Sequence, residues 1–279
     1  MELIKTGLEL QAILSQISDK QSVGFVPTMG ALHEGHLSLV EEAGKENDII
    51  VVSIFVNPTQ FNDKKDLVAY PKKLEEDLKK LKNTSCNVVY APGNDDVYPE
   101  PDLRKFDFGG LEMVMEGKHR PGHFNGVAQV VSKLLEIVKP QKVYFGLKDF
   151  QQLTIIKAMV KKLEIETEII GCPIVREANG LAMSSRNERL TREERENCAF
   201  IFRTLSESRN IAGELSVEQL REWVIASINK TPGLVVEYFE IVNDINLQPV
   251  KSWADLSVKV GCIAVFCRDV RLIDNIVFN

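Results

Sequence analysis

Residues 22–40, SVGFVPTMGALHEGHLSLV, decide how this chain folds. The apolar run from Val23 to Val26 predicts a buried strand, and the Pro-Thr-Met-Gly segment after it predicts a turn. The apolar residues that follow the turn suit a helix packed on a sheet. Strand, glycine-containing turn and helix begin a βαβ unit, in which backbone N–H groups at the helix N-terminus can hold an anion.

Two histidines lie where this turn leads into the helix. His33 and His36 are three residues apart, so in a first helical turn both imidazoles point to the same side, over the anion site. Gly30 and Gly35 let a bulky ligand approach the backbone closely. Imidazoles titrate near neutrality and can donate to negative charge that builds on phosphorus, so the pair favours phosphate chemistry.

Two other interpretations of the histidine pair have to be weighed. The rings could be half-buried polar side chains with a structural role only. They could also bind zinc, because HEGH resembles the zinc-protease motif superficially. That motif places its histidines at i and i+4, whereas these are at i and i+3. The sequence therefore predicts no metal site built from protein side chains.

Composition is typical of a soluble enzyme. The chain has 279 residues, 44% of them hydrophobic and 27% charged, which is enough for one large or two smaller domains. A formal net charge of −6 argues against a nucleic-acid partner. The longest apolar runs are too short to span a bilayer, and no signal-peptide core is present. Five cysteines without CxxC spacing indicate free thiols, so we expect a cytoplasmic protein without a membrane partner.

Strand and helix patterns alternate through the first part of the chain. The β-branched run over 48–56 is typical of a central parallel strand buried on both faces. Further strands are expected over 87–90, 141–145 and 165–170, and helices over 8–17, 71–82, 127–138 and 150–163. Residues 1–175 are therefore expected to form a Rossmann-like parallel-sheet catalytic domain.

The pattern changes after Thr191. Amphipathic helices are expected over 192–210 and 217–230, followed by strands over 234–242, 258–267 and 272–278. Helices followed by a small antiparallel sheet indicate a smaller α+β domain, which we assign to residues 176–279.

Polar residues follow the predicted strands. Gln60 lies in an irregular segment after the 48–56 strand, at a sheet edge where α/β proteins bind ligands, although an ordinary turn is the alternative. Arg120 ends a long irregular connection over 93–122 and could present a cation to an anionic substrate, or lie in a plain surface loop. After the 141–145 strand, Lys148 could neutralise phosphate, Asp149 could cap a helix, and Gln152 faces the same edge.

A polar loop over 176–187 contains two hydroxyls and a guanidinium in succession, Ser184, Ser185 and Arg186. The pattern is typical of a flexible segment. It suits a mobile clamp on a polyphosphate, and a simple linker is the alternative.

Five sequence blocks together resemble the pantoate–β-alanine ligase family. The blocks are Pro27–His36, Asn57–Phe61, Arg120–Val127, Gly146–Gln152 and Met183–Asn187. The HxGH motif alone marks the wider nucleotidylyltransferase superfamily, whereas five blocks in order and spacing are specific. One departure is Leu147, where many members have Glu, at a position that is expected to be read through its backbone.

The resemblance implies ATP-dependent ligation of (R)-pantoate and β-alanine, a step of pantothenate and coenzyme A biosynthesis. ATP and pantoate would give an enzyme-bound pantoyl adenylate and pyrophosphate. The β-alanine amine would then attack the acyl carbon and release pantothenate and AMP. Mg²⁺ would accompany ATP, and the family resemblance implies a homodimer.

The resemblance also implies roles for individual residues. His36 would act as proton donor, and His33, Lys148, Arg186 and Arg120 would complete the catalytic set. Gln60 would bind pantoate and β-alanine, and Gln152 would bind pantoate. The implied ATP-binding residues are Met29, Gly30, Ala31, Leu32, His33, Glu34, Gly35, His36, Gly146, Leu147, Lys148, Asp149, Val175, Met183, Ser184, Ser185 and Arg186.

A pantoyl adenylate is labile in water, so a closing cover is expected. The candidates are the irregular segment 57–69 and the second domain, which would act as a lid through its Met183–Arg186 loop. The main alternative function is another HxGH nucleotidylyltransferase that acts on a phosphate acceptor. A nucleotide-sensing protein without turnover is the alternative from a different class.

Overall fold

The structure, a computed structural model, describes residues 1–18, 20–61 and 64–278. The chain forms two compact units. Unit 1 comprises Met1–Phe108, Arg120–Leu147 and Gln152–Pro173, and unit 2 comprises Gly109–His119, Lys148–Gln151 and Ile174–Asn279. Of the segment 57–69, which was expected to be irregular, residues 62–63 lie outside the described residues.

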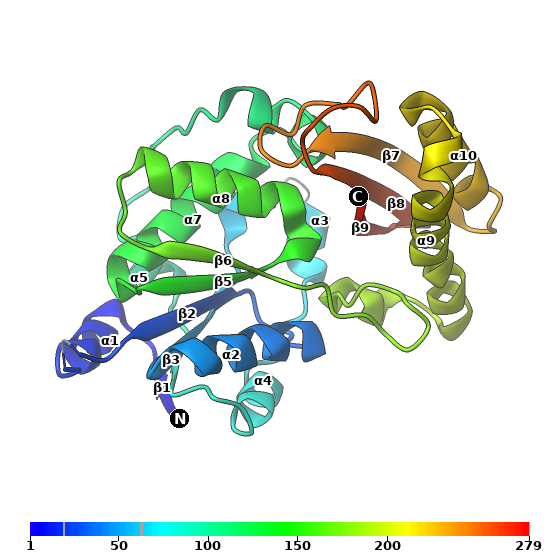
Figure 1. Ribbon diagram of the computed structural model, residues 1–279. Coiled ribbons are helices and arrows are strands. Elements are labelled where there is room, and N and C mark those ends of the chain that lie inside the picture. The colour runs from blue at the N-terminus through cyan, green and yellow to red at the C-terminus, as the bar shows by residue number, and fades with distance from the viewer. Residues whose placement is uncertain (19, 62–63, 279) are drawn as a thin grey trace. The chain divides into compact units, whose positions relative to one another are not determined.

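Unit 1 is built on a six-stranded sheet in which every pairing is parallel. The strand order is β1-β4-β3-β2-β5-β6 (Figure 1). The strands are β1 (Glu2–Ile4), β2 (Val23–Thr28), β3 (Ile49–Ile54), β4 (Val88–Tyr90), β5 (Lys142–Gly146) and β6 (Glu168–Cys172). The predicted Rossmann-like parallel sheet is confirmed, and β1 is a short edge strand that the sequence did not indicate.

Helices cover both faces of this sheet. The helices are α1 (Gly7–Leu14), α2 (Glu34–Glu46), α3 (Lys64–Ala69), α4 (Leu74–Leu81), α5 (Asn94–Val97), α7 (His123–Val138) and α8 (Phe150–Lys162), with 3-10 turns η1 (Pro58–Gln60) and η3 (Leu147–Asp149). Figure 1 shows α2 and α4 on one face and α7 and α8 on the other. Right-handed crossovers in opposite directions from the sheet centre require this division.

Helix α4 begins three residues later than the sequence predicted. The expected start was Pro71, but the first helical hydrogen bond runs from the Asp77 N–H to the Lys73 carbonyl at 2.9 Å. Lys73 is therefore the N-cap residue, and Pro71 lies before the helix. The apolar stripe governs the start, because Leu74 is its first member and Leu81 is fully buried.

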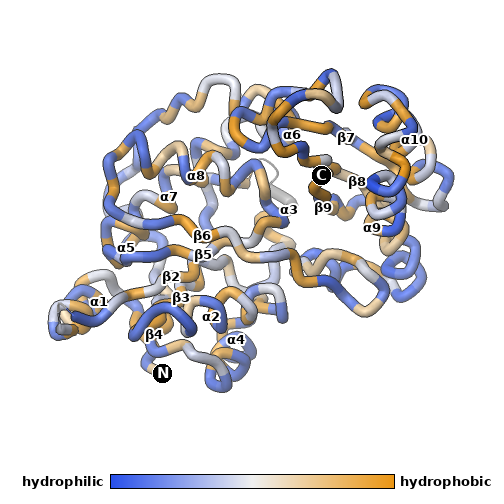
Figure 2. Tube along the Cα trace, in the orientation of Figure 1, coloured by the Kyte–Doolittle hydropathy of each residue, from blue (hydrophilic) through white to orange (hydrophobic). Residues whose placement is uncertain are grey.

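The centre of the unit 1 sheet is apolar. Phe25, Val26, Val51 and Val52 in β2 and β3 have no exposed surface. Figure 2 shows hydrophobic residues concentrated in the strands, with hydrophilic residues common in the helices and loops. Burial of each large apolar side chain contributes roughly 1.5–3 kcal/mol to stability. The central strands are therefore held firmly, and so are the polar residues that follow them at the edge of the sheet.

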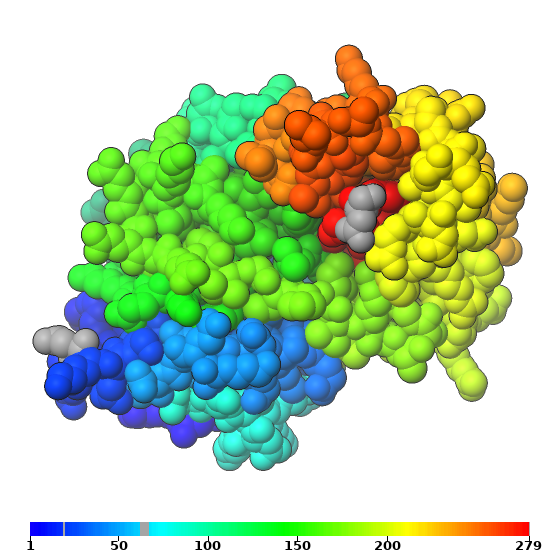
Figure 3. Space-filling view, in the orientation of Figure 1, coloured from blue at the N-terminus to red at the C-terminus, as the bar shows by residue number. Residues whose placement is uncertain are grey.

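Unit 2 contains a three-stranded antiparallel sheet in the order β7-β8-β9, as the sequence predicted. Its strands are β7 (Leu234–Asn243), β8 (Lys259–Cys267) and β9 (Val270–Phe278). Its helices are α6 (Met115–His119), α9 (Arg192–Ile211) and α10 (Val217–Asn229), with 3-10 turns η2 (Gly109–Glu112), η4 (Ser185–Arg189) and η5 (Ala212–Glu214). Figure 3 shows α10, in yellow, on the outer surface of this unit.

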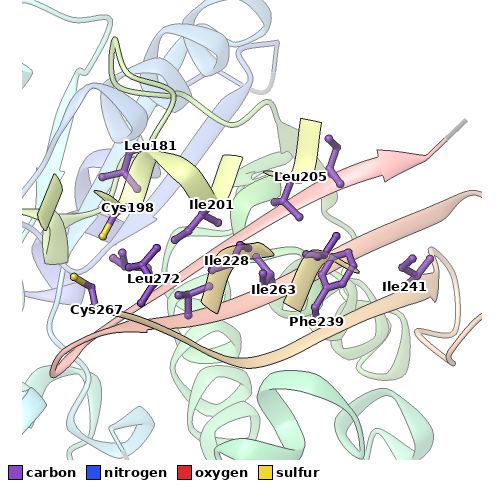
Figure 4. Close-up of a cluster of buried hydrophobic side chains, with 14 of the residues drawn as sticks. Leu181, Cys198, Ile201, Leu205, Ile228, Phe239, Ile241, Ile263, Cys267 and Leu272 are labelled. Atoms are coloured by element: carbon purple, nitrogen blue, oxygen red, sulfur yellow. The ribbon is translucent and has the colours of Figure 1, made fainter. Parts of the chain in front are cut away.

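The core of unit 2 lies between its two long helices and the sheet. Figure 4 shows Ile201 and Leu205 of α9, Ile228 of α10, and Phe239 and Ile263 of the sheet gathered in one cluster. Each of these side chains is 3% exposed or less, which makes the cluster a continuous core for this unit.

A buried ion pair joins segment Gly109–His119 to the sheet of unit 2. Glu116 is 7% exposed and receives two bonds from the Arg271 guanidinium, at 2.8 and 2.6 Å. The Tyr238 hydroxyl donates to the same carboxylate at 2.7 Å. Burial, followed by the nearby Glu116 charge, raises the pKa of Tyr238 well above its usual value, so this hydroxyl stays a donor. The contacts hold α6 in unit 2, immediately before Arg120 in the chain.

Among the described residues, no helix is both long and apolar enough to cross a membrane. All five cysteines are free thiols and buried, as the absence of paired spacing predicted.

Candidate active site

The candidate site begins at the centre of the unit 1 sheet, where the strand order reverses. From β2 the chain continues to β3 on one side, and from β5 it continues to β6 on the other. Only Gly24 and Phe25 of β2 pair with β5, so the two strands are unpaired toward their carboxyl ends. This is the place where open α/β sheets bind ligands. Segment Met29–His36 follows β2, Gly146 ends β5 and Leu147 follows it, so the predicted motifs lie at this switch point.

The turn after β2 has an unusual backbone that its sequence explains. Gly30 has φ 82° and Ala31 has φ 49°, so two successive residues are left-handed. A Cβ on Gly30 would lie 3.0 Å from the Ile54 side chain and 3.1 Å from Asp77 Oδ2, so tight contacts add to the positive φ in favouring glycine. The Thr28 hydroxyl accepts from the Gly30 N–H at 3.2 Å and donates to the Ser53 carbonyl at 2.7 Å.

The two histidines form the N-terminal cap of α2. His33 is the N-cap residue, and its Nδ1 accepts from the Gly35 N–H at 3.1 Å. His36 Nδ1 accepts from the His33 N–H at 3.3 Å. The ring centroids are 4.0 Å apart, so the pair is also in direct contact.

These hydrogen bonds assign the tautomer of both rings. A nitrogen that accepts from a backbone N–H carries no proton, so each neutral ring carries its proton on Nε2. Protonation of Nδ1 would bring two N–H groups face to face and break the cap. Each ring therefore presents an Nε2–H donor on the side opposite to its cap bond.

Gln60 is held in η1, close to the turn that follows β2. Its Nε2 donates to Met29 Sδ at 2.8 Å, which brings two predicted site residues into contact. Asn57 Nδ2 lies 3.3 Å from Gln60 Oε1 and also donates to the Gly126 carbonyl at 3.1 Å. Asn57 is 1% exposed, and sequence analysis did not single it out, although its place at the end of a buried strand was a usable signal.

The N-terminus of α7 supports η1. His123 Nδ1 lies 2.8 Å from the Gln60 carbonyl oxygen, and His123 is 6% exposed. A Cβ on Gly126 would lie 2.5 Å from the Thr59 carbonyl oxygen, so the close approach of α7 to η1 requires glycine. Arg120 is half-buried just before this helix and accepts, through its carbonyl, from the His123 N–H at 3.0 Å.

Two adjacent glutamines differ in what they contact. Gln151 is 4% exposed, accepts from the Glu116 N–H at 2.8 Å, and donates to the carbonyls of Leu111 and Val114. Its side chain is therefore occupied with holding segment Gly109–His119 in unit 2. Gln152, the residue predicted to bind substrate, is half-buried and belongs to unit 1.

The segment predicted to be a flexible polar loop is a short hairpin in unit 2. Arg176 and Ala182 form an antiparallel bridge, and the Met183 N–H donates to the Val175 carbonyl at 3.0 Å. The Arg176 guanidinium pairs with Asp274 at 2.7 and 2.9 Å. The predicted loop thus contains one isolated β-bridge, and the ion pair ties its first strand position to a distant part of the sequence.

The hydroxyl run after the hairpin starts a 3-10 turn. The Ser184 hydroxyl accepts from the Arg186 N–H at 3.3 Å and caps η4, and Ser185 is 8% exposed. Asn187 Nδ2 donates to Glu177 and to the Ala182 carbonyl, which ties the turn to the hairpin. In the same unit, Asn275 donates to the Lys148 carbonyl at 3.1 Å, which anchors the backbone at Lys148 to β9.

The predicted site residues divide between the two units. Unit 1 contains Met29, Gly30, Ala31, Leu32, His33, Glu34, Gly35, His36, Gln60, Arg120, Gly146, Leu147 and Gln152. Unit 2 contains Lys148, Asp149, Val175, Met183, Ser184, Ser185 and Arg186. Within unit 1 the histidines contact each other and Gln60 contacts Met29. Leu32 is 1% exposed, and its N–H and carbonyl are bonded to Asp77 and Lys80. In the described parts of the chain, no cluster of three or more His, Cys, Asp or Glu residues could hold a metal ion.

Comparisons with known proteins agree along the whole chain. Residues 2–277 match the family described as pantoate–β-alanine ligase. A pantothenate synthetase of Bacteroides fragilis (strain YCH46) is 54% identical over 280 positions, covering 100% of this chain and 99% of the relative. One from Porphyromonas gingivalis (strain ATCC 33277) is 51% identical, with 100% of both chains covered.

Solved structures give the same result for the fold. A pantothenate synthetase of Thermus thermophilus superimposes with a TM-score of 0.92 at 40% identity and covers 99% of each chain. The pantoate–β-alanine ligase of Francisella tularensis, solved in complex with beta-gamma ATP and β-alanine, gives a TM-score of 0.85 at 37% identity, covering 99% of this chain and 97% of that one. The chain therefore belongs to the pantoate–β-alanine ligase family and is a ligase that joins pantoate to β-alanine.

Proposed function

We propose that the chain makes pantothenate in two ATP-dependent steps through a bound pantoyl adenylate. The observation that carries this proposal is the pair of Nε2–H imidazoles at the switch point between β2 and β5. Neutral donors held by cap bonds can face a phosphate without prior reorganisation, which is the most effective way to stabilise developing charge.

In the first step a pantoate carboxylate oxygen attacks the α-phosphorus of ATP. The bond from that phosphorus to the bridging oxygen of the β-phosphate breaks, and pyrophosphate leaves. His36 and His33 donate hydrogen bonds from Nε2–H to the α-phosphate and the leaving group and keep their protons, so pyrophosphate leaves as an anion. Two anions must be brought in line, so positioning and charge neutralisation carry most of the rate.

Cationic and hydroxyl groups neutralise the phosphates in this proposal. Lys148, Arg120 and Arg186 supply the positive charge, and Ser184 and Ser185 supply hydroxyl donors. Mg²⁺ enters with ATP as part of the substrate, because it retains several waters and binds largely through phosphate oxygens. The adenosine contacts are assigned to Met29, Gly146, Asp149 and Val175, together with the backbone of the Gly30–His36 segment and Leu147.

Gln60 and Gln152 bind pantoate in this proposal. Neutral amides can orient a carboxylate and a hydroxyl without holding the nucleophile in a salt bridge. The contacts of Gln60 with Asn57 and Met29 support its role, because they fix the amide before substrate arrives. Gln60 also helps to place β-alanine.

In the second step the neutral amine of β-alanine attacks the acyl carbon. The bond from that carbon to the phosphate oxygen breaks, AMP leaves, and the amine nitrogen loses a proton. Water must be excluded from the bound adenylate until β-alanine attacks it. We assign that cover to residues 176–279, which include the Met183–Arg186 segment, and to 57–69, and we place the enzyme in the cytoplasm as a homodimer.

Pantoate-dependent exchange of labelled pyrophosphate into ATP, without β-alanine, tests this route. If the adenylate is an intermediate, exchange should require pantoate. Adding β-alanine should then stop the exchange, because the adenylate is consumed and AMP and pantothenate are released. Exchange or nucleotide transfer that requires a phosphate ester in place of pantoate would instead favour a different HxGH nucleotidylyltransferase.

A further inference from the structure

A buried carboxylate outside every sequence motif contacts the nucleotide-binding turn. Asp77 of α4 is 0% exposed, and its two oxygens accept from the Ala31 N–H at 2.8 Å and the Leu32 N–H at 2.7 Å. Lys80, one turn later on the same helix, donates to the Leu32 carbonyl at 2.5 Å. The N–H and the carbonyl of Leu32 are thus both bonded to side chains of α4.

These bonds hold the turn at its most strained place. Ala31 has φ 49°, a left-handed backbone that is unfavourable for a residue with a Cβ. Such a conformation persists only where the surroundings over-determine it. The Asp77 carboxylate supplies two charge-assisted bonds for that purpose, directly before the His33 cap of α2.

We propose that Asp77 and Lys80 are positioning residues for ATP, which fix the Gly30–Leu32 turn and through it the histidine pair. Asp77 has no exposed surface, so it cannot touch substrate and acts only through the backbone that it binds. This inference rests on the proposed role of the turn in ATP binding.

The charges of the two residues fit this role. A lone carboxylate beside a polyphosphate site would repel the nucleotide, but the nearby Lys80 ammonium offsets that charge. The Ala31 and Leu32 N–H groups are directed to Asp77, which leaves the imidazole Nε2–H groups as donors toward phosphate. Burial raises the pKa of Asp77, and the bonds from Leu32 and Ala31 and the Lys80 charge oppose part of that rise.

Asp77→Asn is the decisive variant, because it keeps the size of the side chain but turns one acceptor into a donor facing an N–H group. Asp96→Asn is the matched control. The Asp96 carboxylate of α5 likewise accepts from a backbone N–H, that of Gly7 at the start of α1, at 2.9 and 3.1 Å. A third variant, Lys80→Met, removes the bond to the Leu32 carbonyl at a partly exposed position.

Three quantities are measured on the full chain: KM for ATP in pyrophosphate release, KM for β-alanine, and ATP affinity by calorimetry without pantoate. We expect KM for ATP to rise, and calorimetric ATP affinity to fall, about 10- to 100-fold in Asp77→Asn, as misplacement of a binding group predicts. Lys80→Met should show a smaller loss in the same direction. KM for β-alanine should not change, and Asp96→Asn should keep the wild-type ATP affinity.

A merely structural role would lower the active fraction and leave both KM values and the calorimetric affinity unchanged. Asp77→Asn with wild-type ATP affinity, or with the same loss as Asp96→Asn, would overturn the inference. If Asp77→Asn does not fold, an unchanged ATP affinity in Lys80→Met overturns it. Wild-type protein that binds ATP but does not release pyrophosphate with pantoate would refute the proposed function alone, because calorimetry still tests the positioning.

Discussion

The two nitrogens of His36 have separate tasks, and two substitutions can separate them. Nδ1 accepts the cap bond from the His33 N–H at 3.3 Å, and Nε2–H is the proposed donor to phosphate. In His36→Asn the side-chain oxygen can take the place of Nδ1, whereas no atom takes the place of Nε2. In His36→Ala both are lost.

The magnitudes follow from these contacts. Loss of a cap acceptor costs about 1 kcal/mol, and a cap bond of 3.3 Å is long, so the cost should lie at or below that value. For a chain of this size, 1 kcal/mol lowers Tm by roughly 2–4 °C. Loss of a preorganised donor to a developing oxyanion costs about 100-fold or more in rate.

We therefore expect both variants to lose about 100-fold or more in pantoate-dependent pyrophosphate release, measured in single turnover. Only His36→Ala should also lose thermal stability, measured by calorimetry or circular dichroism. Undiminished adenylation in either variant would refute the donor role of Nε2. Equal Tm values for the alanine and asparagine variants would refute the cap.

Three further predictions concern other parts of the chain. Gly126→Ala places a methyl group 2.5 Å from the Thr59 carbonyl oxygen, so η1 must move. KM for pantoate should then rise several-fold while ATP affinity stays the same. An unchanged KM for pantoate would contradict the support of Gln60 by α7. Arg186→Ala should raise KM for ATP, and an unchanged value in steady-state kinetics would count against a polyphosphate clamp. Burial raises the pKa of Cys86 to about 12 and that of Cys172 to about 11, so both thiols stay protonated below about pH 9. Both should react with a thiol reagent only after unfolding. Rapid labelling of these two thiols in the native protein would contradict their burial.

The sequence predicted the elements whose patterns are long and regular. The β-branched run of β3 and the amphipathic pattern of α7 need no distant partner to be recognised. The short strand β1 was missed because three residues at a sheet edge carry no periodicity, and only pairing with β4 defines it. In the 93–122 connection, α6 is held by the bond between Glu116 and Arg271, 155 positions apart, which no local pattern reveals.

Part of the candidate site was likewise visible in the sequence. The histidine pair, Gln60 and Gln152 follow strands and are polar, which marks them as candidates. Asp77 was missed because it follows Glu75 and Glu76 on a charged helix, where an acidic residue usually faces water. Its burial depends on the backbone of a turn some 45 residues earlier, so only the tertiary structure shows its partner. The tautomer of the histidines also depends on backbone geometry that the sequence does not contain.

Pyrophosphate release from Mg–ATP, measured with pantoate, with β-alanine, and with both together, tests the central claim most directly. With both substrates we expect sustained turnover that yields AMP and pantothenate in equal amounts. With pantoate alone, release should stop after about one equivalent per site, because the adenylate stays bound. Release that does not depend on pantoate, or ADP and phosphate as products, would contradict adenylation of pantoate at the histidine pair.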